Sequence, residues 1–263
     1  MEIAAVCTDL DGTFLSLKND ITEYSVRQIQ KIKDRFPIVL ASARSPKSML
    51  YLQKRMHIVG HPMICYNGTL IYNEGHFSDL ATIPHNQALE IHLECKKLGI
   101  HLGLYYQDKW LVPTDSERVQ KEIFNTRTEP QYQETGKSLK EHSPLGWHKL
   151  MLMGTKTTAD AIQPLLEKRF HGDLHIYRSN DTLIEIAPAG VSKLTALEQI
   201  LGRDGVGNTL AFGDNYNDME LMAAVGKSVA VANARPEVLQ LADDHCGACK
   251  EDGVAYYLAS FFN

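Results

Sequence analysis

The chain has 263 residues, of which 44% are hydrophobic and 22% charged, and its formal net charge at pH 7 is −5. This composition is typical of a folded globular protein with one large or two smaller domains. It contains no lysine- or arginine-rich run, which argues against a nucleic-acid-binding protein, and no apolar run near the roughly 20 residues that span a bilayer. The first residues, MEIAAVC, lack the basic region of a signal peptide. We therefore expect a cytoplasmic protein whose five cysteines are reduced thiols.

The first part of the chain alternates short apolar runs with amphipathic segments. Buried strands are predicted at 3–8, 37–41 and 63–66. A helix is predicted over 22–35, where apolar residues recur at helical spacing and Thr22 can cap the first turn. A second helix is predicted to have Ser45 as its N-cap and Pro46 as its first residue. Strands and helices that alternate at this spacing favour right-handed crossovers and a parallel sheet.

The pattern changes after residue 68, where a hairpin is predicted over 68–83 with its turn at 73–75. Helices are then predicted near 86–98, 116–125 and 157–169, and strands at 99–106, 109–113, 148–153, 174–178 and 182–187. The parallel pattern resumes with helices at 193–201, 217–224, 235–241 and 253–261, and strands at 209–213 and 228–232. The order predicts an α/β fold in which a parallel-sheet core, 1–83 with 188–263, is interrupted by an inserted α+β domain at 84–187.

Polar residues and glycines follow predicted strands of the core, and Lys193 stands at the start of the predicted helix at 193–201. Because ligands of open parallel sheets bind at the carboxyl ends of the strands, we expect these residues to converge. They are Asp9, Asp11, Gly12, Thr13, Ser42, Arg44, Asn67, Gly68, Lys193, Asp214, Asn217 and Asp218. Clustered carboxylates favour a hard cation such as Mg²⁺ or Ca²⁺, and lysine and serine supply donors for phosphate oxygens. A carboxylate can also act as a nucleophile, with its neighbour two residues away moving the proton.

Each of these residues also has a structural interpretation. Asp-Gly is a common turn, and Asn217 and Asp218 precede a predicted helix, as capping residues do. Lys193 begins a helix, where a cation is mildly unfavourable, and this favours a functional role. A calcium loop of the EF-hand type would need further acidic ligands after Gly12, and the sequence continues Thr-Phe-Leu-Ser-Leu. The combination of residues therefore favours a reaction centre.

The segments DLDGT (9–13), Ser42, Lys193 and GDNYND (213–218) follow the order of the four motifs of the haloacid-dehalogenase-like superfamily. The chain resembles in particular its Cof-type members with a class IIB cap, and the phrases YNGTLIYN, EIAPAGVSK, GDNYNDMEL and EDGVAYYL are also similar. The resemblance covers essentially the whole chain. It implies a Rossmann-like core with an inserted α+β cap. It also implies Mg²⁺-dependent hydrolysis of the phosphate monoesters of small metabolites, sugar phosphates foremost, through an aspartyl phosphate.

The resemblance also implies a role for each residue of the motifs. Asp9 would be the nucleophile, Asp11 the proton shuttle, and Ser42 and Lys193 the groups that hold the phosphoryl group. Mg²⁺ would bind to Asp9, to the backbone carbonyl of Asp11 and to Asp214, with support from Asp218 directly or through water. The expected phosphate- and substrate-binding residues are Gly12, Ser42, Ala43, Arg44, Asn67, Lys193 and Asn217.

The sequence departs from the family pattern at two places. The second motif, usually Thr-Gly-Arg, is Ser42-Ala43-Arg44 here, and a serine hydroxyl can still donate a hydrogen bond. The residue after Lys193 is Leu194 where glycine is usual, which removes no catalytic group.

Other candidates carry less weight. Cys246 and Cys249 form an isolated CxxC, and a zinc site needs about two more ligands. His171 and His175 are separated by Gly172 at a predicted helix end, which disfavours a metal pair. The aromatic residues of the inserted hairpins could line a substrate pocket or simply pack their sheet. They are Tyr105, Tyr106, Trp110 and Tyr177, with Arg178 beside them.

Two other functions stay open at this point. They are a phosphomutase on the same scaffold and a non-enzymatic protein that binds a metal or another ligand. The expected partner is a small phosphorylated metabolite, with no nucleic acid and no membrane. The sequence leaves the oligomeric state open, and a monomer is plausible because a large cap can shield the site without a second copy.

Overall fold

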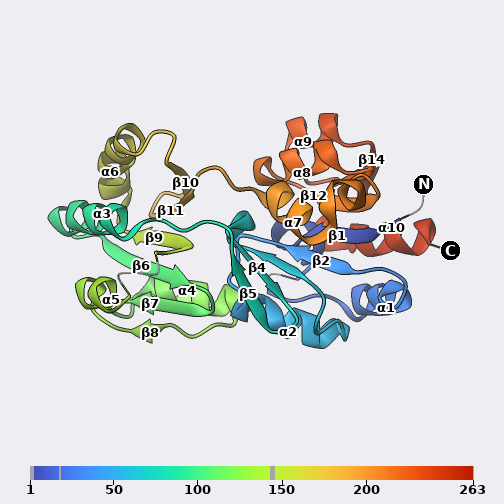
Figure 1. Cartoon of the computed structure of the whole chain (residues 1–263), viewed down its shortest axis with the longest axis horizontal. Helices are drawn as coiled ribbons and strands as arrows, with labels where there is room; N and C mark the ends of the chain where they lie inside the picture. The colour runs from blue at the N-terminus through green and yellow to red at the C-terminus, as the bar shows by residue number, and fades with distance from the viewer. Residues whose placement is uncertain (1–2, 18, 143–145, 263) are drawn as a thin grey trace. The chain divides into compact units, whose positions relative to one another are not determined.

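The computed structural model describes residues 3–17, 19–142 and 146–262, and the chain divides into two compact units (Figure 1). The first unit comprises the described residues up to Ser78 and from Val191 onward, and the second runs from Asp79 to Gly190. The inserted segment predicted at 84–187 lies within the second unit. That unit also includes the chain just before it, where Ile83 pairs with Trp147 in an antiparallel bridge.

An eight-stranded sheet forms the centre of the first unit, in the order β14-β13-β12-β1-β2-β3-β4-β5. The six strands from β14 to β3 are parallel, and β4 joins β3 antiparallel. The hairpin predicted over 68–83 corresponds to β4 and β5, which are neighbours at the edge of the sheet. The strands are β1 (Ala5–Asp9), β2 (Ile38–Ala41), β3 (Met63–Cys65), β4 (Leu70–Asn73), β5 (His76–Asp79), β12 (Thr209–Gly213), β13 (Lys227–Val231) and β14 (Asp244–Cys246). Every residue of β1, β2 and β12 is buried, as is typical of parallel strands covered on both faces. This confirms the predicted parallel-sheet fold.

Helices cover both faces of this sheet, with α1 and α2 on one side and α7, α8 and α9 on the other (Figure 1). They are α1 (Glu23–Ile32), α2 (Lys47–Met56), α7 (Lys193–Val206), α8 (Met219–Ala224), α9 (Pro236–Leu241) and α10 (Gly253–Phe261). Helix α1 begins as predicted, because the Thr22 hydroxyl accepts a hydrogen bond from the Ser25 amide. Helix α2 begins one residue after the predicted Pro46, although the Ser45 hydroxyl does accept from the Ser48 amide. Gly202, with φ +69°, breaks α7 just after the predicted helix end at 201.

A six-stranded sheet forms the second unit, in the order β10-β11-β9-β6-β7-β8. Its strands are β6 (His101–Tyr106), β7 (Lys109–Val112), β8 (Gln131–Tyr132), β9 (Lys149–Met153), β10 (Leu174–Asn180) and β11 (Leu183–Pro188). Its helices are α3 (His85–Lys97), α4 (Glu117–Thr126), α5 (Thr135–Glu141) and α6 (Lys156–Arg169). Alternate residues of the central strands share one core with α3, α5 and α6, and Leu104, Leu150 and Ile186 are examples. This is the α+β arrangement predicted for the insert.

The sequence pattern did not predict three elements, which are β8, β14 and α5. Two of them are strands of two or three residues, and α5 lies in a polar stretch whose apolar anchor, Leu139, gives no helical period. The helix predicted at 217–224 is divided into a tight turn, Tyr216–Asp218, and α8. Among the described residues, none of the helices combines the length and the apolar character that crossing a membrane requires.

Candidate active site

The chain leaves β1 at Asp9 through a wide turn that brings it against the end of β12. The Leu15 amide closes this turn by donating to the Leu10 carbonyl at 2.9 Å. Gly12 has φ +92°, and a Cβ at this position would lie 2.5 Å from Oδ2 of Asp214. Thr13 fixes the same carboxylate by donating to its Oδ1 at 3.0 Å. The Asp-Gly dipeptide therefore allows the close approach of two loops, in addition to making a turn.

Lys193 connects two of the predicted site carboxylates. Its side chain is fully buried, and Nζ donates to Oδ1 of Asp9 at 2.6 Å and to Oδ1 of Asp218 at 2.7 Å. Burial alone would lower the pKa of this ammonium, but the two carboxylates outweigh burial and raise it. Lys193 is thus a fixed cation at the carboxyl ends of β1 and β12, where the sequence predicted it.

Asp218 uses both of its oxygens within the protein. Oδ1 accepts from Lys193, and Oδ2 accepts from the backbone amides of Asp214 and Asn215 at 3.0 and 3.1 Å. The side chain is completely buried. A carboxylate with these partners holds the loop after β12 and orients the lysine, so its contacts favour indirect support of a metal over direct ligation.

Asp9, Asp214 and Asp218 each offer an oxygen, and these three atoms lie within 4.8 Å of one another. Burial, reinforced by the charges of Asp218 and Asp214 and opposed by Lys193, raises the pKa of Asp9 to about 8. Burial and Asp218 raise the pKa of Asp214 to about 6. One lysine therefore does not compensate the cluster fully. A divalent cation bound to these oxygens would compensate the remaining negative charge, and carboxylate oxygens are ligands that suit Mg²⁺.

The loop after β2 carries Ser42, Ala43 and Arg44. Ser42 is 1% exposed, and its hydroxyl accepts from the Arg44 amide at 3.3 Å. The Arg44 guanidinium grips the carboxylate of Asp11, with both nitrogen–oxygen distances at 2.7 Å. Its pKa is raised because Asp11 outweighs burial. The sequence predicted Arg44 as a substrate-binding group, whereas its guanidinium is directed here to the predicted proton shuttle.

Asn67 and Asn217 meet across the site, with Nδ2 of Asn217 donating to Oδ1 of Asn67 at 3.0 Å. Tyr66, Asn67 and Gly68 follow β3 with three successive positive φ angles, 51°, 57° and 107°. Gly68 abuts the backbone carbonyl of Ser192, so a side chain there would collide with the start of α7. Left-handed backbone at a tyrosine is strained and is most often kept where a site requires it.

Two further residues that the sequence did not single out hold the site loops. The Asn233 amide donates to the Gly12 carbonyl at 2.8 Å and accepts from the Cys249 amide at 2.7 Å. The Tyr51 hydroxyl accepts from Arg44 at 3.3 Å and donates to the Asn19 carbonyl. No local pattern marks either residue, because each acts through a partner far away in the sequence.

The cysteine and histidine pairs that carried little weight lie outside the acidic cluster. The Cys249 thiol donates to the Leu15 carbonyl at 3.1 Å, and burial raises the pKa of both Cys246 and Cys249 to about 12. Thiols with such pKa values are poor metal ligands and poor nucleophiles. In the part of the chain that the structure describes, neither thiol belongs to a group of three possible metal ligands, nor does His171 or His175.

The fold and this site correspond to a known family. The model of the haloacid dehalogenase-like hydrolases matches residues 6–258, so the chain belongs to this family. It is 25% identical to the 5-amino-6-(5-phospho-D-ribitylamino)uracil phosphatase YitU of Bacillus subtilis, over 98% of the chain and 97% of that protein. The family match and the similarity to a named phosphatase together make the protein a phosphoric monoester hydrolase of the haloacid dehalogenase-like class.

Solved structures of other proteins share the fold of this chain. The protein TM0651 of Thermotoga maritima is 28% identical, with a TM-score of 0.88 over 98% of this chain and 97% of that one. The subclass IIB sugar phosphatase BT4131 shares the fold, with a TM-score of 0.77 and 20% identity over 98% of this chain and 99% of that one. The Cof-type, class IIB resemblance is thereby confirmed.

Proposed function

We propose that the protein is a Mg²⁺-dependent phosphatase that hydrolyses phosphate monoesters of small metabolites through an aspartyl phosphate on Asp9. The observation that carries the proposal is the double contact of the buried Lys193 with Asp9 and Asp218, with Asp214 beside them. A fixed cation among carboxylates at the sheet edge can hold a phosphoryl group and stabilise the charge on its oxygens.

In the first step, an oxygen of Asp9 attacks phosphorus while the bond from phosphorus to the leaving oxygen breaks. Asp11 gives its proton to that leaving oxygen. In the second step, Asp11 takes a proton from water, which attacks phosphorus and releases Asp9 as a carboxylate and inorganic phosphate. Lys193 and Ser42 hold the phosphoryl oxygens throughout, and Gly12, Ala43, Asn67 and Asn217 complete the pocket for phosphate.

Mg²⁺ would be held by Asp9, Asp214 and the backbone carbonyl of Asp11, with Asp218 in support, and it supplies positive charge that neutralises the phosphate and the carboxylates. The raised pKa values of Asp9 and Asp214 support this assignment, because each marks a carboxylate short of compensating charge. Asp9 must be ionised to attack phosphorus, so the cation would also favour the reactive form of the nucleophile.

The substrates that we expect are small phosphorylated metabolites, sugar phosphates foremost. One relative is named for a phosphorylated ribitylaminouracil and one structural neighbour for sugar phosphates, so both substrate types belong in a test. The resemblance to the family implies that the inserted unit chooses the leaving group. We therefore place substrate choice in the second unit and the chemistry in the first.

The test is phosphate release from a panel of sugar, polyol and heterocycle monoesters, with Mg²⁺ and with a chelator. Asp9→Asn should abolish release, because an amide cannot form the aspartyl phosphate. The matched control is Asp34→Asn, since the Asp34 side chain is 83% exposed on the same unit. No Mg²⁺-dependent release from any ester, or undiminished release by Asp9→Asn, would overturn the proposal.

A further inference from the structure

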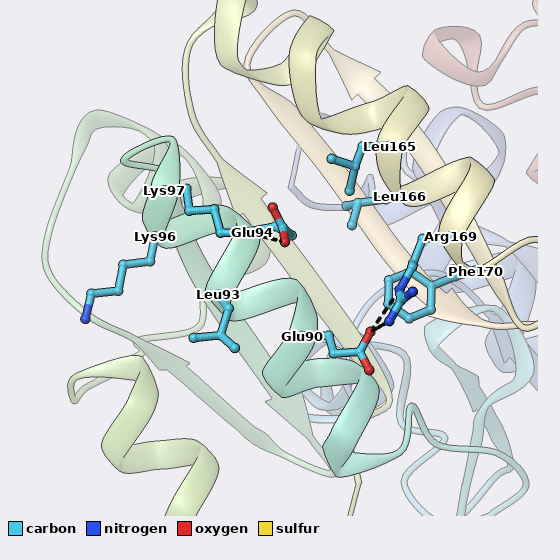
Figure 2. Close-up of a pocket in the computed structure, with 9 residues that line it drawn as sticks. All are labelled: Glu90, Leu93, Glu94, Lys96, Lys97, Leu165, Leu166, Arg169 and Phe170. Atoms are coloured by element: carbon cyan, nitrogen blue, oxygen red, sulfur yellow. Dashed lines mark hydrogen bonds and ion pairs between the residues drawn. The ribbon is translucent and has the colours of Figure 1, made fainter.

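A groove lies between helices α3 and α6 of the second unit, on the side of these helices that faces away from their sheet (Figure 2). Its volume is about 810 Å³. The residues that line it are Glu90, Leu93, Glu94, Lys96, Lys97, Leu165, Leu166, Arg169 and Phe170. Leu93 and Leu165 stand on its two sides with 49% and 45% of their surfaces exposed, and Leu89, one turn before Leu93, is 39% exposed.

Leu89 and Leu93 do not lie on the face of α3 that packs against its sheet. Ala88, Ile91 and Cys95 make that contact, and all three are fully buried. Leu89 and Leu93 are one turn apart, so they form a second apolar stripe on the opposite side of the helix. An apolar stripe beside an apolar groove is a feature of a surface that binds a partner, whereas scattered single leucines are not.

The charges around the groove are balanced and ordered along α3. Glu90 and Glu94 come first in the helix, and Lys96 and Lys97 come last. Glu90 accepts from Arg169 of α6 at 2.8 Å, and Glu94 accepts from Lys97 at 2.7 Å (Figure 2). A surface of this kind is not suited to a membrane or a nucleic acid, because acidic and basic groups both line it. The α3 helix is instead complementary to a copy of itself that runs in the opposite direction.

We propose that this groove is the interface of a symmetric dimer, in which α3 of each subunit packs antiparallel against α3 of the other. A two-fold axis beside Leu93 places it against Leu93 of the partner subunit. The same axis places Glu90 opposite Lys97 of the partner subunit, and the reverse pair follows by symmetry. Leu89 and Leu93 then cover the groove of the partner, and Leu165 forms its far wall. The leucines supply the buried centre and the charge pairs supply the direction.

The first test is the mass of the whole protein in solution, measured by sedimentation velocity or light scattering over a range of concentrations. A monomer has a mass of 29.5 kDa. We expect the unmodified protein to approach twice this mass as its concentration rises, and Leu93→Asp to keep the monomer mass throughout. The matched control is Leu241→Asp, because Leu241 is 37% exposed on the other unit and should leave the dimer intact. Circular dichroism and phosphate release report whether each variant is folded, because none of these residues belongs to the proposed reaction centre.

The second test uses the charges. Glu90→Lys places like charges opposite each other and should weaken the dimer at least tenfold at low salt, and Lys97→Glu should do the same. The double variant, Glu90→Lys with Lys97→Glu, restores opposite signs across the axis and should recover most of the lost affinity. A groove with another occupant would not recover in this way.

The outcome is decided without any substrate, so it does not depend on the proposed phosphatase activity. A monomer mass at every concentration would overturn the dimer. A dimer that Leu93→Asp leaves unchanged would place the interface elsewhere and overturn the assignment of this groove.

Discussion

Arg44 binds both oxygens of Asp11, with Nε 2.7 Å from Oδ2 and Nη2 2.7 Å from Oδ1. The Arg44 side chain is 5% exposed and the Asp11 side chain 52%, so the buried, Tyr51-supported arginine determines where the exposed carboxylate lies. A bidentate ion pair with a guanidinium requires an ionised carboxylate. In the proposed reaction Asp11 carries a proton at the first step, so this pair must loosen when substrate arrives and form again after the proton is given up.

The first prediction concerns Arg44→Ala, which removes this support. We expect turnover of esters with poor leaving groups, such as sugar phosphates, to fall by about tenfold or more, because these depend on a well-placed proton donor. Turnover of p-nitrophenyl phosphate, whose leaving oxygen needs no proton, should fall much less. Asp11→Asn should show the same selectivity with a larger loss, and Arg203→Ala, 92% exposed, should show none. Equal losses on both kinds of ester would instead make Arg44 a group that binds phosphate.

The second prediction concerns Lys193→Met, which leaves Asp9 and Asp218 buried without their cation. Removing one member of a buried ion pair costs about 3–5 kcal/mol, so the free energy of unfolding should fall by an amount of that order. Phosphate release should fall by at least about 100-fold, because the lysine is proposed to hold the phosphoryl group. Urea denaturation and phosphate release measure the two effects. Adding Asp218→Asn to the variant should recover part of the stability and none of the activity, since it removes an uncompensated charge without restoring a cation.

The alternation of strands and helices was sufficient to predict the parallel core, because buried strands such as β1 and β12 are continuous apolar runs. It was also sufficient to bring Asp9 and Asp214 to one edge, since parallel strands end together, and Lys193 joins them from the first turn of α7. The order of the four motifs then narrowed the chemistry. Hydrophobic periodicity does not predict short or polar elements such as α5 and β14, because contacts with the rest of the fold stabilise them.

What the sequence could not predict are contacts that depend on side-chain direction. Arg44 stays a predicted substrate-binding residue, and no sequence pattern indicated that its guanidinium also binds Asp11 with Tyr51, from the next helix, in support. The sequence predicted Asp218 as a metal ligand or a helix cap. It could not show that the backbone amides of the loop after β12 donate to the second oxygen of this carboxylate. The sequence also could not predict the proposed role of Leu89 and Leu93 of α3, because periodicity identifies an apolar residue but not what packs against it.

The third prediction compares two glycines with similar backbone. Gly12 and Gly75 have φ +92° and +86°, but a Cβ at Gly12 meets Asp214 whereas nothing lies within 4 Å at Gly75. Gly75→Ala should cost about 1–2 kcal/mol through backbone strain alone and leave phosphate release unchanged. Gly12→Ala should pay the same strain and also displace the Asp214 carboxylate, so Mg²⁺-dependent activity should fall at least about tenfold. If both variants keep full activity, the close approach of the two loops is not needed for the reaction.

The last prediction joins metal binding to pH. Burial and neighbouring carboxylates raise the pKa of Asp9 to about 8 and that of Asp214 to about 6, both above the values of an unfolded chain. The folded protein without metal therefore holds extra protons, and the stability that these two groups contribute is present at acid pH and is lost as pH rises toward 8. Mg²⁺ must displace those protons, so its apparent affinity should rise by about tenfold per unit between pH 6 and 8.

Thermal unfolding with and without Mg²⁺ measures this effect, because a ligand of the folded state raises the melting temperature according to its affinity. The Mg²⁺-induced rise should be small near pH 5 and largest near pH 8. Asp9→Asn removes the group with the higher pKa and should flatten the dependence above pH 6, whereas Asp34→Asn should follow the unmodified protein. An Mg²⁺ effect that is the same at both ends of this range would show that neither carboxylate releases a proton to the metal.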